Sequence, residues 1–233
     1  MPRNEKEIKK SSWLAPLAGL AALGAGLTGY GVFSPRSQLF GPQVWRLAGG
    51  QLCALTFDDG PQEPYTSRLL DLLGQEGVPA TFFVLGRQVE RHPALLQRMR
   101  AEGHAVGIHG YSHAAFPFIS TARLAGELDR SLALVGGAQL VRPPYGWKDW
   151  RLARLARERG LTVVGWSAHG ADWRRGTAQE IADRLLRRIT PGAIALLHDG
   201  CAEDPSADRG RSVEAAALVI AALKGQGYRF VRL

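Results

Sequence analysis

Short apolar runs alternate with amphipathic stretches along the chain from residue 51 to the C-terminus. The apolar runs predict strands at 52–57, 80–85, 105–109, 140–142, 162–166, 193–198 and 228–231. Apolar residues at helical spacing predict helices at 65–76, 88–102, 121–135, 149–159, 177–190 and 211–224. This alternation predicts an α/β fold with a mainly parallel sheet, and six or seven such units suit a barrel as well as an open sheet.

The N-terminal part of the chain has a different pattern. Residues 1–12 form a polar, basic tail, and residues 13–33 form an apolar run without a charge. As a helix of about 1.5 Å per residue, this run is roughly long enough to cross a hydrocarbon core of ~30 Å. The lysines before it favour a cytoplasmic N-terminus, so we expect a transmembrane anchor at 13–33. A cleaved signal peptide and a buried or peripheral Gly/Ala-rich helix are the alternatives, since five glycines weaken the spanning signal.

Residues 34–50 have the proline and glycine content of a linker, which leaves 51–233 as one folded domain. Within that domain, polar side chains follow the apolar runs: Asp58, Asp59, His109, Arg142, Asp172 and His198. In parallel α/β folds the carboxyl ends of the strands meet at one face, where active sites collect. We therefore expect these side chains to converge.

The sequence TFDDGP at residues 56–61 places two carboxylates where a strand ends and a turn begins. Consecutive side chains on an extended chain point in opposite directions, so we expect Asp58 and Asp59 to have different roles. One would bind a metal and the other would face a substrate. The alternative is a turn in which an aspartate only hydrogen-bonds to nearby backbone.

His109 and His113 are four residues apart. If this stretch coils, both imidazoles point the same way, as in a divalent metal site that needs a third ligand and an open position. Asp59 is the candidate for the third ligand. The alternative is a pair of histidines on a helix surface or in the core.

Two further segments offer polar groups at the ends of apolar runs. Two prolines stiffen RPPYG at residues 142–146, so Arg142 is held near the sheet, where it could keep Asp58 ionised. The pair Asp172-Trp173 and the run ending at His198 add an acid, an apolar wall and a third histidine. A capped core histidine is the alternative for His198.

The segments TFDDGP, H-x-x-x-H, RPPYG, DW and LLH, in this order, resemble the polysaccharide deacetylase family, which includes chitin, chitooligosaccharide and peptidoglycan deacetylases. The resemblance covers roughly residues 44–233. Each motif is weak alone, whereas the ordered set is highly specific. The resemblance implies a distorted (β/α) barrel, with 51–233 as the catalytic domain. It also implies a divalent metal ion, usually zinc and sometimes cobalt or another transition ion.

Carried over motif by motif, the resemblance implies that Asp59, His109 and His113 bind the metal. Asp58 would be the general base and His198 the general acid. Five further residues would orient the base and the acid, wall the acetyl pocket or help to hold the oxyanion: Arg142, Asp172, Trp173, Leu196 and, through its backbone N–H, Tyr145.

Two positions depart from the family pattern. Gly110 stands where the family usually has Ser or Thr, and its lack of a hydroxyl puts the stability of that loop in doubt. His169 stands three residues before Asp172, where the family often has an acid, and could add a sugar contact. Neither position supplies a metal ligand or a catalytic atom.

A net charge of +8 and a pI near 10.0 favour polyanionic partners in general. The arginines, however, are spread over several predicted helices and are not interleaved with aromatics. We therefore expect a solvated basic surface and no nucleic-acid partner. The two cysteines, Cys53 and Cys201, form neither a metal-type pair nor a disulfide framework.

We therefore expect a metal-dependent hydrolase that removes N-acetyl groups from a glycan of the GlcNAc or MurNAc type, giving acetate and a free amino sugar. The catalytic domain is expected to be monomeric and to lie outside the cytoplasm, held to the membrane by the N-terminal segment or secreted if that segment is cleaved. The alternatives are a deacylase of a lipid-linked amino sugar and a catalytically silent glycan-binding domain. The second would not need Asp58 and His198 together.

Overall fold

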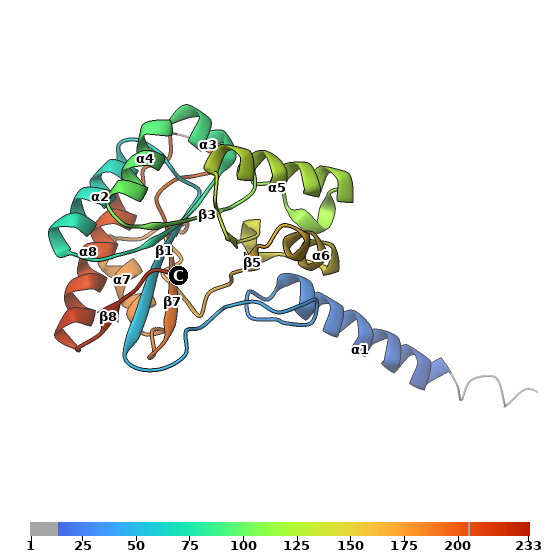
Figure 1. Cartoon of the computed structure of the whole chain (residues 1–233). Helices are drawn as coiled ribbons and strands as arrows, with labels where there is room; N and C mark the ends of the chain where they lie inside the picture. Colours follow the sequence, from blue (N-terminus) through green and yellow to red (C-terminus); the bar gives the residue numbers. More distant parts are fainter. Residues whose placement is uncertain (1–13, 205) are drawn as a thin grey trace, which may run out of the picture.

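The computed structural model describes residues 14–204 and 206–233, so the predicted polar tail at 1–12 lies outside the described residues (Figure 1). The strands are β1 (Leu52–Asp58), β2 (Thr81–Val84), β3 (Ala105–Ile108), β4 (Leu140–Val141), β5 (Thr162–Val163), β6 (Ala168–His169), β7 (Ala193–His198) and β8 (Arg229–Phe230). The helices are α1 (Leu14–Phe33), α2 (Tyr65–Glu76), α3 (Gly86–Arg91), α4 (Pro93–Ala101), α5 (Thr121–Val135), α6 (Trp150–Glu158), α7 (Ala178–Leu186) and α8 (Gly210–Gly225). Two short 3₁₀ turns are η1 (Phe116–Phe118) and η2 (Pro144–Gly146).

The strands pair in the order β5-β4-β3-β2-β1-β7-β6, with β8 also paired to β1. Each of these pairings is parallel. Six residues of β1 are buried, as expected for a strand covered on both faces. Helices α8, α7, α2, α4, α3, α5 and α6 surround the sheet (Figure 1). The predicted distorted (β/α) barrel is confirmed, and it is open between β5 and β6.

A segment near the N-terminus lies across this opening. The Val44 N–H donates to Val163 O over 2.9 Å, and the Gly165 N–H donates to Val44 O over 2.8 Å. Further along, the Leu47 N–H donates to Gly192 O over 2.8 Å. Residues 44–47 therefore connect the two sides of the open barrel.

Residues before this segment also pack against the domain. Ser37 is buried, and the Gln43 side chain donates from Nε2 to Pro35 O over 2.8 Å. Arg36 donates from Nη2 to Ser167 O over 2.6 Å. Arg36 thus finds a partner on the barrel, a contact that the Pro/Gly content of the predicted linker at 34–50 does not reveal.

Of the predicted segment at 13–33, residue 13 lies outside the described residues and the rest forms α1, which extends away from the barrel (Figure 1). Among the helices of the described part of the chain, none combines the length and apolarity that crossing a membrane requires. The predicted transmembrane anchor is therefore not supported.

One predicted helix is divided in the structure, and one strand was not predicted, each for a local reason. The helix expected at 88–102 is divided into α3 and α4, because His92 takes a non-helical φ of −130° before Pro93. Strand β6 was not predicted, since Ala168 and His169 form only a two-residue strand without an apolar run.

The two cysteines are both free thiols, as expected from the sequence. Cys53 is buried, and burial raises the pKa of its thiol to about 12.

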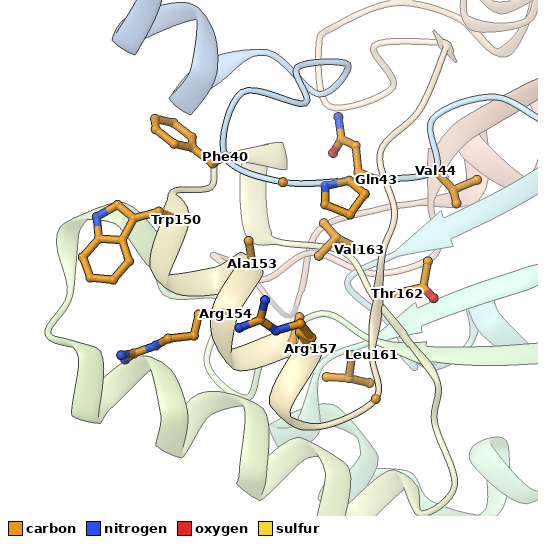
Figure 2. Close-up of a pocket in the computed structure, with 14 residues that line it drawn as sticks. Phe40, Gln43, Val44, Trp150, Ala153, Arg154, Arg157, Leu161, Thr162 and Val163 are labelled. Carbon is orange, nitrogen blue, oxygen red and sulfur yellow. The ribbon is translucent and has the colours of Figure 1, made fainter.

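A surface depression of about 680 Å³ lies between residues 40–44, α6 and β5. Its lining side chains are drawn in Figure 2. Its lining includes Trp150, Arg154 and Arg157, together with apolar side chains such as Phe40 and Val163. No carboxylate or histidine lines it. The depression therefore lacks the groups that hydrolysis requires, and a second cavity holds them.

Candidate active site

The carboxyl ends of neighbouring strands bring the predicted polar residues together. Asp58, the last residue of β1, is in register with His198 at the end of β7. His109 directly follows β3, and Arg142 directly follows β4. The convergence expected from the sequence is therefore present at one end of the barrel.

Asp58 and Arg142 form a buried ion pair. Arg142 is fully buried, and its Nη1 donates to Asp58 Oδ1 over 2.7 Å and to Thr56 Oγ1 over 2.8 Å. Its Nη2 donates to Gly165 O over 3.0 Å. Burial lowers the pKa of Arg142, although the charge of Asp58 opposes this, and an arginine stays protonated in a protein. The pair fixes one carboxylate oxygen of Asp58 and leaves Oδ2 free.

The turn after β1 brings both aspartates to the same cavity. Asp59 has a positive φ of 76°, which ends the strand alternation, and His109 Nε2 lies 3.8 Å from Asp58 Oδ2 and 3.6 Å from Asp59 Oδ1. The opposite directions expected from alternation are therefore not observed. Gly60 follows because a Cβ there would lie 2.1 Å from Asp199 Oδ2. Asp199 in turn accepts a hydrogen bond from Thr66 Oγ1 over 2.6 Å, and burial raises the pKa of Asp199 to about 7.

The two histidines of H-x-x-x-H lie on a turn, not on the coil that the spacing suggested. Their ring centroids are 5.2 Å apart. The turn closes around the Glu127 carboxylate, which accepts from the Tyr111 N–H over 2.7 Å and the Ser112 N–H over 2.8 Å. Gly110 adopts a φ of 79° in this turn. Glu127 therefore supplies the loop-stabilising bonds that Gly110 lacks.

Asp59, His109 and His113 fit a divalent cation. One ligand atom from each lies within 4.8 Å of the others. His109 Nε2 is 3.6 Å, and His113 Nε2 is 3.3 Å, from Asp59 Oδ1, a buried atom with no hydrogen-bond partner in the described structure. Burial raises the pKa of Asp59, so a positive charge there would be favourable.

Both imidazoles are in the form that binds a metal. Burial lowers the pKa of His109 and of His113, which keeps the rings neutral near pH 7. His109 Nδ1 lies 2.7 Å from Arg142 O, and a carbonyl only accepts, so Nδ1 carries the proton. The lone pair of His109 Nε2 therefore faces Asp59.

His198 is held by a buried carboxylate. Asp172 Oδ1 lies 2.9 Å from His198 Nδ1, and Asp172 Oδ2 accepts from the His198 N–H and from Ser212 Oγ, each over 2.8 Å. Burial lowers the pKa of His198, but the charge of Asp172 and its hydrogen bond outweigh burial and raise the pKa to about 9. His198 is therefore an imidazolium near neutral pH.

These groups line a cavity of about 410 Å³. Leu196 is buried in its wall, while Trp173 is half-exposed and meets His198 edge-on at 5.5 Å between ring centroids. Tyr145, with a positive φ of 60°, forms another wall. His169 stacks on Trp173 and is absent from the cavity lining, so its predicted sugar contact gains no support.

Four lining residues were missed from the sequence, namely Trp147, Trp166, Glu203 and Arg209. Glu203 Oε1 lies 3.3 Å from His113 Nδ1 and accepts a hydrogen bond from the Tyr145 hydroxyl over 2.9 Å. Trp147 lines the cavity beside Tyr145. Glu203 lies in a polar loop without periodicity, whereas Trp147 directly follows RPPYG and could have been found there.

The comparisons with known proteins agree with this geometry. The family model described as polysaccharide deacetylase matches residues 48–164. A chitooligosaccharide deacetylase of Sinorhizobium fredii is 36% identical over 209 residues, covering 83% of this chain and 91% of the relative. A peptidoglycan-N-acetylglucosamine deacetylase of Bacillus cereus is 36% identical over 195 residues, covering 81% and 89%.

Solved structures show the same fold. A crystal structure of a peptidoglycan N-acetylglucosamine deacetylase has a TM-score of 0.75 and 32% identity, covering 82% of this chain and 90% of that chain. A pseudoenzyme of Bacillus anthracis from the CE4 family has a TM-score of 0.74 and 24% identity, covering 82% and 67%. The fold is thus compatible with both activity and its absence, so the side chains in the cavity must decide between them.

Proposed function

The chain belongs to the polysaccharide deacetylase family, and we propose that it hydrolyses the N-acetyl groups of an amino-sugar polymer or oligosaccharide to acetate and a free amine. A single observation carries this proposal: one cavity holds a three-residue metal-ligand set, an arginine-bound aspartate and an aspartate-bound histidine. The named relatives act on chitooligosaccharides and on peptidoglycan N-acetylglucosamine, so the proposed substrate carries sugars of the GlcNAc or MurNAc type.

Asp59, His109 and His113 would hold the metal ion. We assign zinc, with cobalt or another transition ion as the alternative, because two imidazoles and one carboxylate are ligands that zinc accepts while keeping an open position. When bound, the cation polarises the acetyl carbonyl and lowers the pKa of a water molecule.

Asp58 is the proposed general base. Its Oδ1 is occupied by Arg142, whereas its Oδ2 lies 3.8 Å from His109 Nε2 and so faces the ligand set. A water molecule attacking the carbonyl carbon would lose its proton to Oδ2. The hydrogen bond from Arg142 to Oδ1 orients the carboxylate for this step.

His198 is the proposed general acid. Asp172 holds its Nδ1, so Nε2 is the atom that can give a proton to the departing amine. The raised pKa of about 9 keeps that proton available near neutral pH. Acetate and a free amino sugar are the products.

The cavity walls would position the acetyl group. Leu196 and Trp173 offer apolar surface on the side of His198. The Tyr145 backbone N–H, on the opposite loop, is the proposed donor to the developing oxyanion. Peptidoglycan lies outside the cytoplasm, so we place the working site of the protein there.

Mass spectrometry of reaction products tests this function. The zinc-loaded protein would be incubated with N-acetylglucosamine oligomers, with peptidoglycan fragments and with polyprenyl-linked amino sugars. Loss of acetyl groups from the oligomers or fragments is the expected result. Loss from the lipid-linked sugar alone would establish the alternative substrate, and loss from none of them would overturn the proposal.

A further inference from the structure

Aromatic side chains form a row that leads out of the catalytic cavity. The ring of Tyr145 meets His113 at 4.5 Å between centroids, and Trp147 lies 4.9 Å beyond Tyr145. Phe118 lies 6.0 Å beyond Trp147. Tyr145 is 44% and Phe118 68% exposed, although large aromatic side chains usually lose most of their exposure on folding.

Phe118 is exposed on a loop that is firmly held. Arg151 of α6 donates from Nη1 to Ile119 O over 2.6 Å, and from Nη2 to Phe116 O over 3.1 Å and Pro117 O over 3.0 Å. Asp149 binds the same guanidinium from the other side. These bonds hold the backbone on both sides of Phe118, so the position of the loop is set before any ligand arrives.

Trp147 is held equally well. The Phe33 ring, at the end of α1, packs edge-on against it at 5.2 Å between centroids. The next residue, Lys148, is buried, its N–H donates to Val32 O over 3.1 Å, and its Nζ donates to Ser34 O over 2.7 Å. The N-terminal segment thus supports Trp147 from behind and leaves its other contacts to Tyr145 and Phe118.

We propose that Tyr145, Trp147 and Phe118 form an aromatic shelf that binds the pyranose ring of the sugar next to the one being deacetylated. This inference rests on the proposed function and extends it from an acetyl group to an oligosaccharide. Trp147 belongs both to the cavity and to the shelf, so one continuous glycan would occupy the two.

The chemistry of a pyranose ring fits this surface. One face of the ring presents C–H groups, which pack on aromatic rings, while its hydroxyl groups stay in water at the edge. The row is rigid, so little side-chain freedom is lost on binding. An oligomer should therefore bind better than a single sugar, and the gain should come from the shelf.

Kinetics on N-acetylglucosamine oligomers test the shelf. Trp147→Ala and Phe118→Ala are compared with wild type on the tetramer and on the monosaccharide, with KM and kcat determined separately. Each substitution should raise the KM for the tetramer by up to about 10-fold, the scale of one aromatic contact. The tetramer-to-monosaccharide ratio of kcat/KM should fall, and Trp147→Phe should restore most of it.

Trp150→Ala is the matched control. Trp150 is 58% exposed but lines the separate depression next to Phe40 and Arg154 (Figure 2), so its loss should leave the ratio unchanged. An unchanged ratio in both shelf variants, with wild type active on the tetramer, would overturn the shelf and leave the deacetylase function standing. A wild type that releases acetate from no glycan would overturn both. Thermal unfolding of each variant shows whether it is folded. If Trp147→Ala is unfolded, the ratio of Phe118→Ala is compared with those of Trp147→Phe and wild type.

Discussion

The neighbouring residues Asp58 and Asp59 show how one turn gives two carboxylates different environments. Asp58 ends β1 and faces a buried guanidinium at 2.7 Å. Asp59 has a positive φ, and its Oδ1 faces two neutral imidazoles. Side-chain alternation predicted opposite directions for the two, but the positive φ of Asp59 ends the alternation and both carboxylates face His109 Nε2. The two differ in their partners, not in their directions.

Substitution of each aspartate should therefore have a different effect. Asp58→Asn keeps the size of the side chain but cannot accept a proton, so turnover should fall by ~10²–10⁴-fold while the metal stays bound. Asp59→Asn removes a charged ligand, so metal content and turnover should fall together. Elemental analysis beside acetate release measures both. If Asp58→Asn loses the metal and Asp59→Asn keeps it, the assigned roles are reversed.

The pH dependence of the reaction should reveal the Asp172–His198 pair. The pKa of His198 is about 9, so the imidazolium that serves as acid is present below pH 9 and is lost as the pH rises through this value. Asp172→Asn removes the charge that raises this pKa, so the alkaline fall of kcat should move to lower pH. The test is a profile of kcat against pH for wild type and for Asp172→Asn. If kcat falls at the same alkaline pH in both proteins, His198 is not the acid.

Glu203 should tune the metal site through His113. Its carboxylate lies 3.3 Å from His113 Nδ1, where it can fix the ring with Nε2 toward Asp59. Loss of such an outer partner typically weakens metal binding by about 10–100-fold. The zinc Kd of Glu203→Gln should therefore be higher than that of wild type by about this factor. Calorimetric titration with zinc measures this directly.

Glu90→Gln provides the matched control for that titration. Glu90 also accepts a hydrogen bond from a tyrosine hydroxyl, that of Tyr111 over 2.8 Å, but it is not among the residues that line the cavity. Its variant should keep wild-type zinc affinity. Equal affinities in all three proteins would show that Glu203 does not support His113.

The elements that hold these residues could be predicted in part. Helices α2 and α5 have the predicted bounds, since long amphipathic periodicity is a strong signal. The turn between His109 and His113 could not be predicted as a turn, because its stabilising partner, Glu127, is supplied by a helix that follows later in the chain. Local spacing therefore singled out the candidate ligands but not the backbone shape that brings them together.

The segment before the barrel contributes to stability as well as to topology. Residues 34–40 include Ser34, whose carbonyl accepts the hydrogen bond from the buried Lys148 ammonium group. Burial lowers the pKa of Lys148 to about 8, so this group is sensitive to the loss of its acceptor. The same segment also donates from Arg36 to Ser167 O.

A truncated protein that starts at Gly41 should therefore be less stable than one that starts at Tyr30. Leaving a buried polar group unpaired costs about 1–3 kcal/mol, which corresponds to roughly 2–10 °C in Tm for a chain of this size. Thermal unfolding of the two proteins makes the comparison. Equal Tm values would mean that residues 30–40 add no stability.

For the whole molecule, the ordered motifs predicted more than any single pattern did. Strand and helix alternation gave the parallel sheet, and the resemblance gave the distorted barrel. The opening between β5 and β6, and the segment 44–47 that crosses it, depend on pairing between residues far apart in the chain, such as Val44 with Val164. No local periodicity carries that information.

The same whole-molecule view explains why fold alone does not establish activity. A pseudoenzyme shares this fold with a TM-score of 0.74, so catalysis must depend on the few side chains in the cavity. In this chain the cavity brings together the proposed metal ligands, the proposed base and the proposed acid. N-deacetylation by this chain should accordingly depend on a bound metal ion.

Removal and return of the metal test this claim most directly. The protein is stripped with a chelator, the loss is checked by elemental analysis, and acetate release from the N-acetylglucosamine tetramer is measured before and after zinc is added. Release should stop in the stripped wild type and return with zinc, while Asp59→Asn should stay inactive at the same zinc concentration. Undiminished release from the stripped protein, or no release from the zinc-loaded wild type, would contradict the claim.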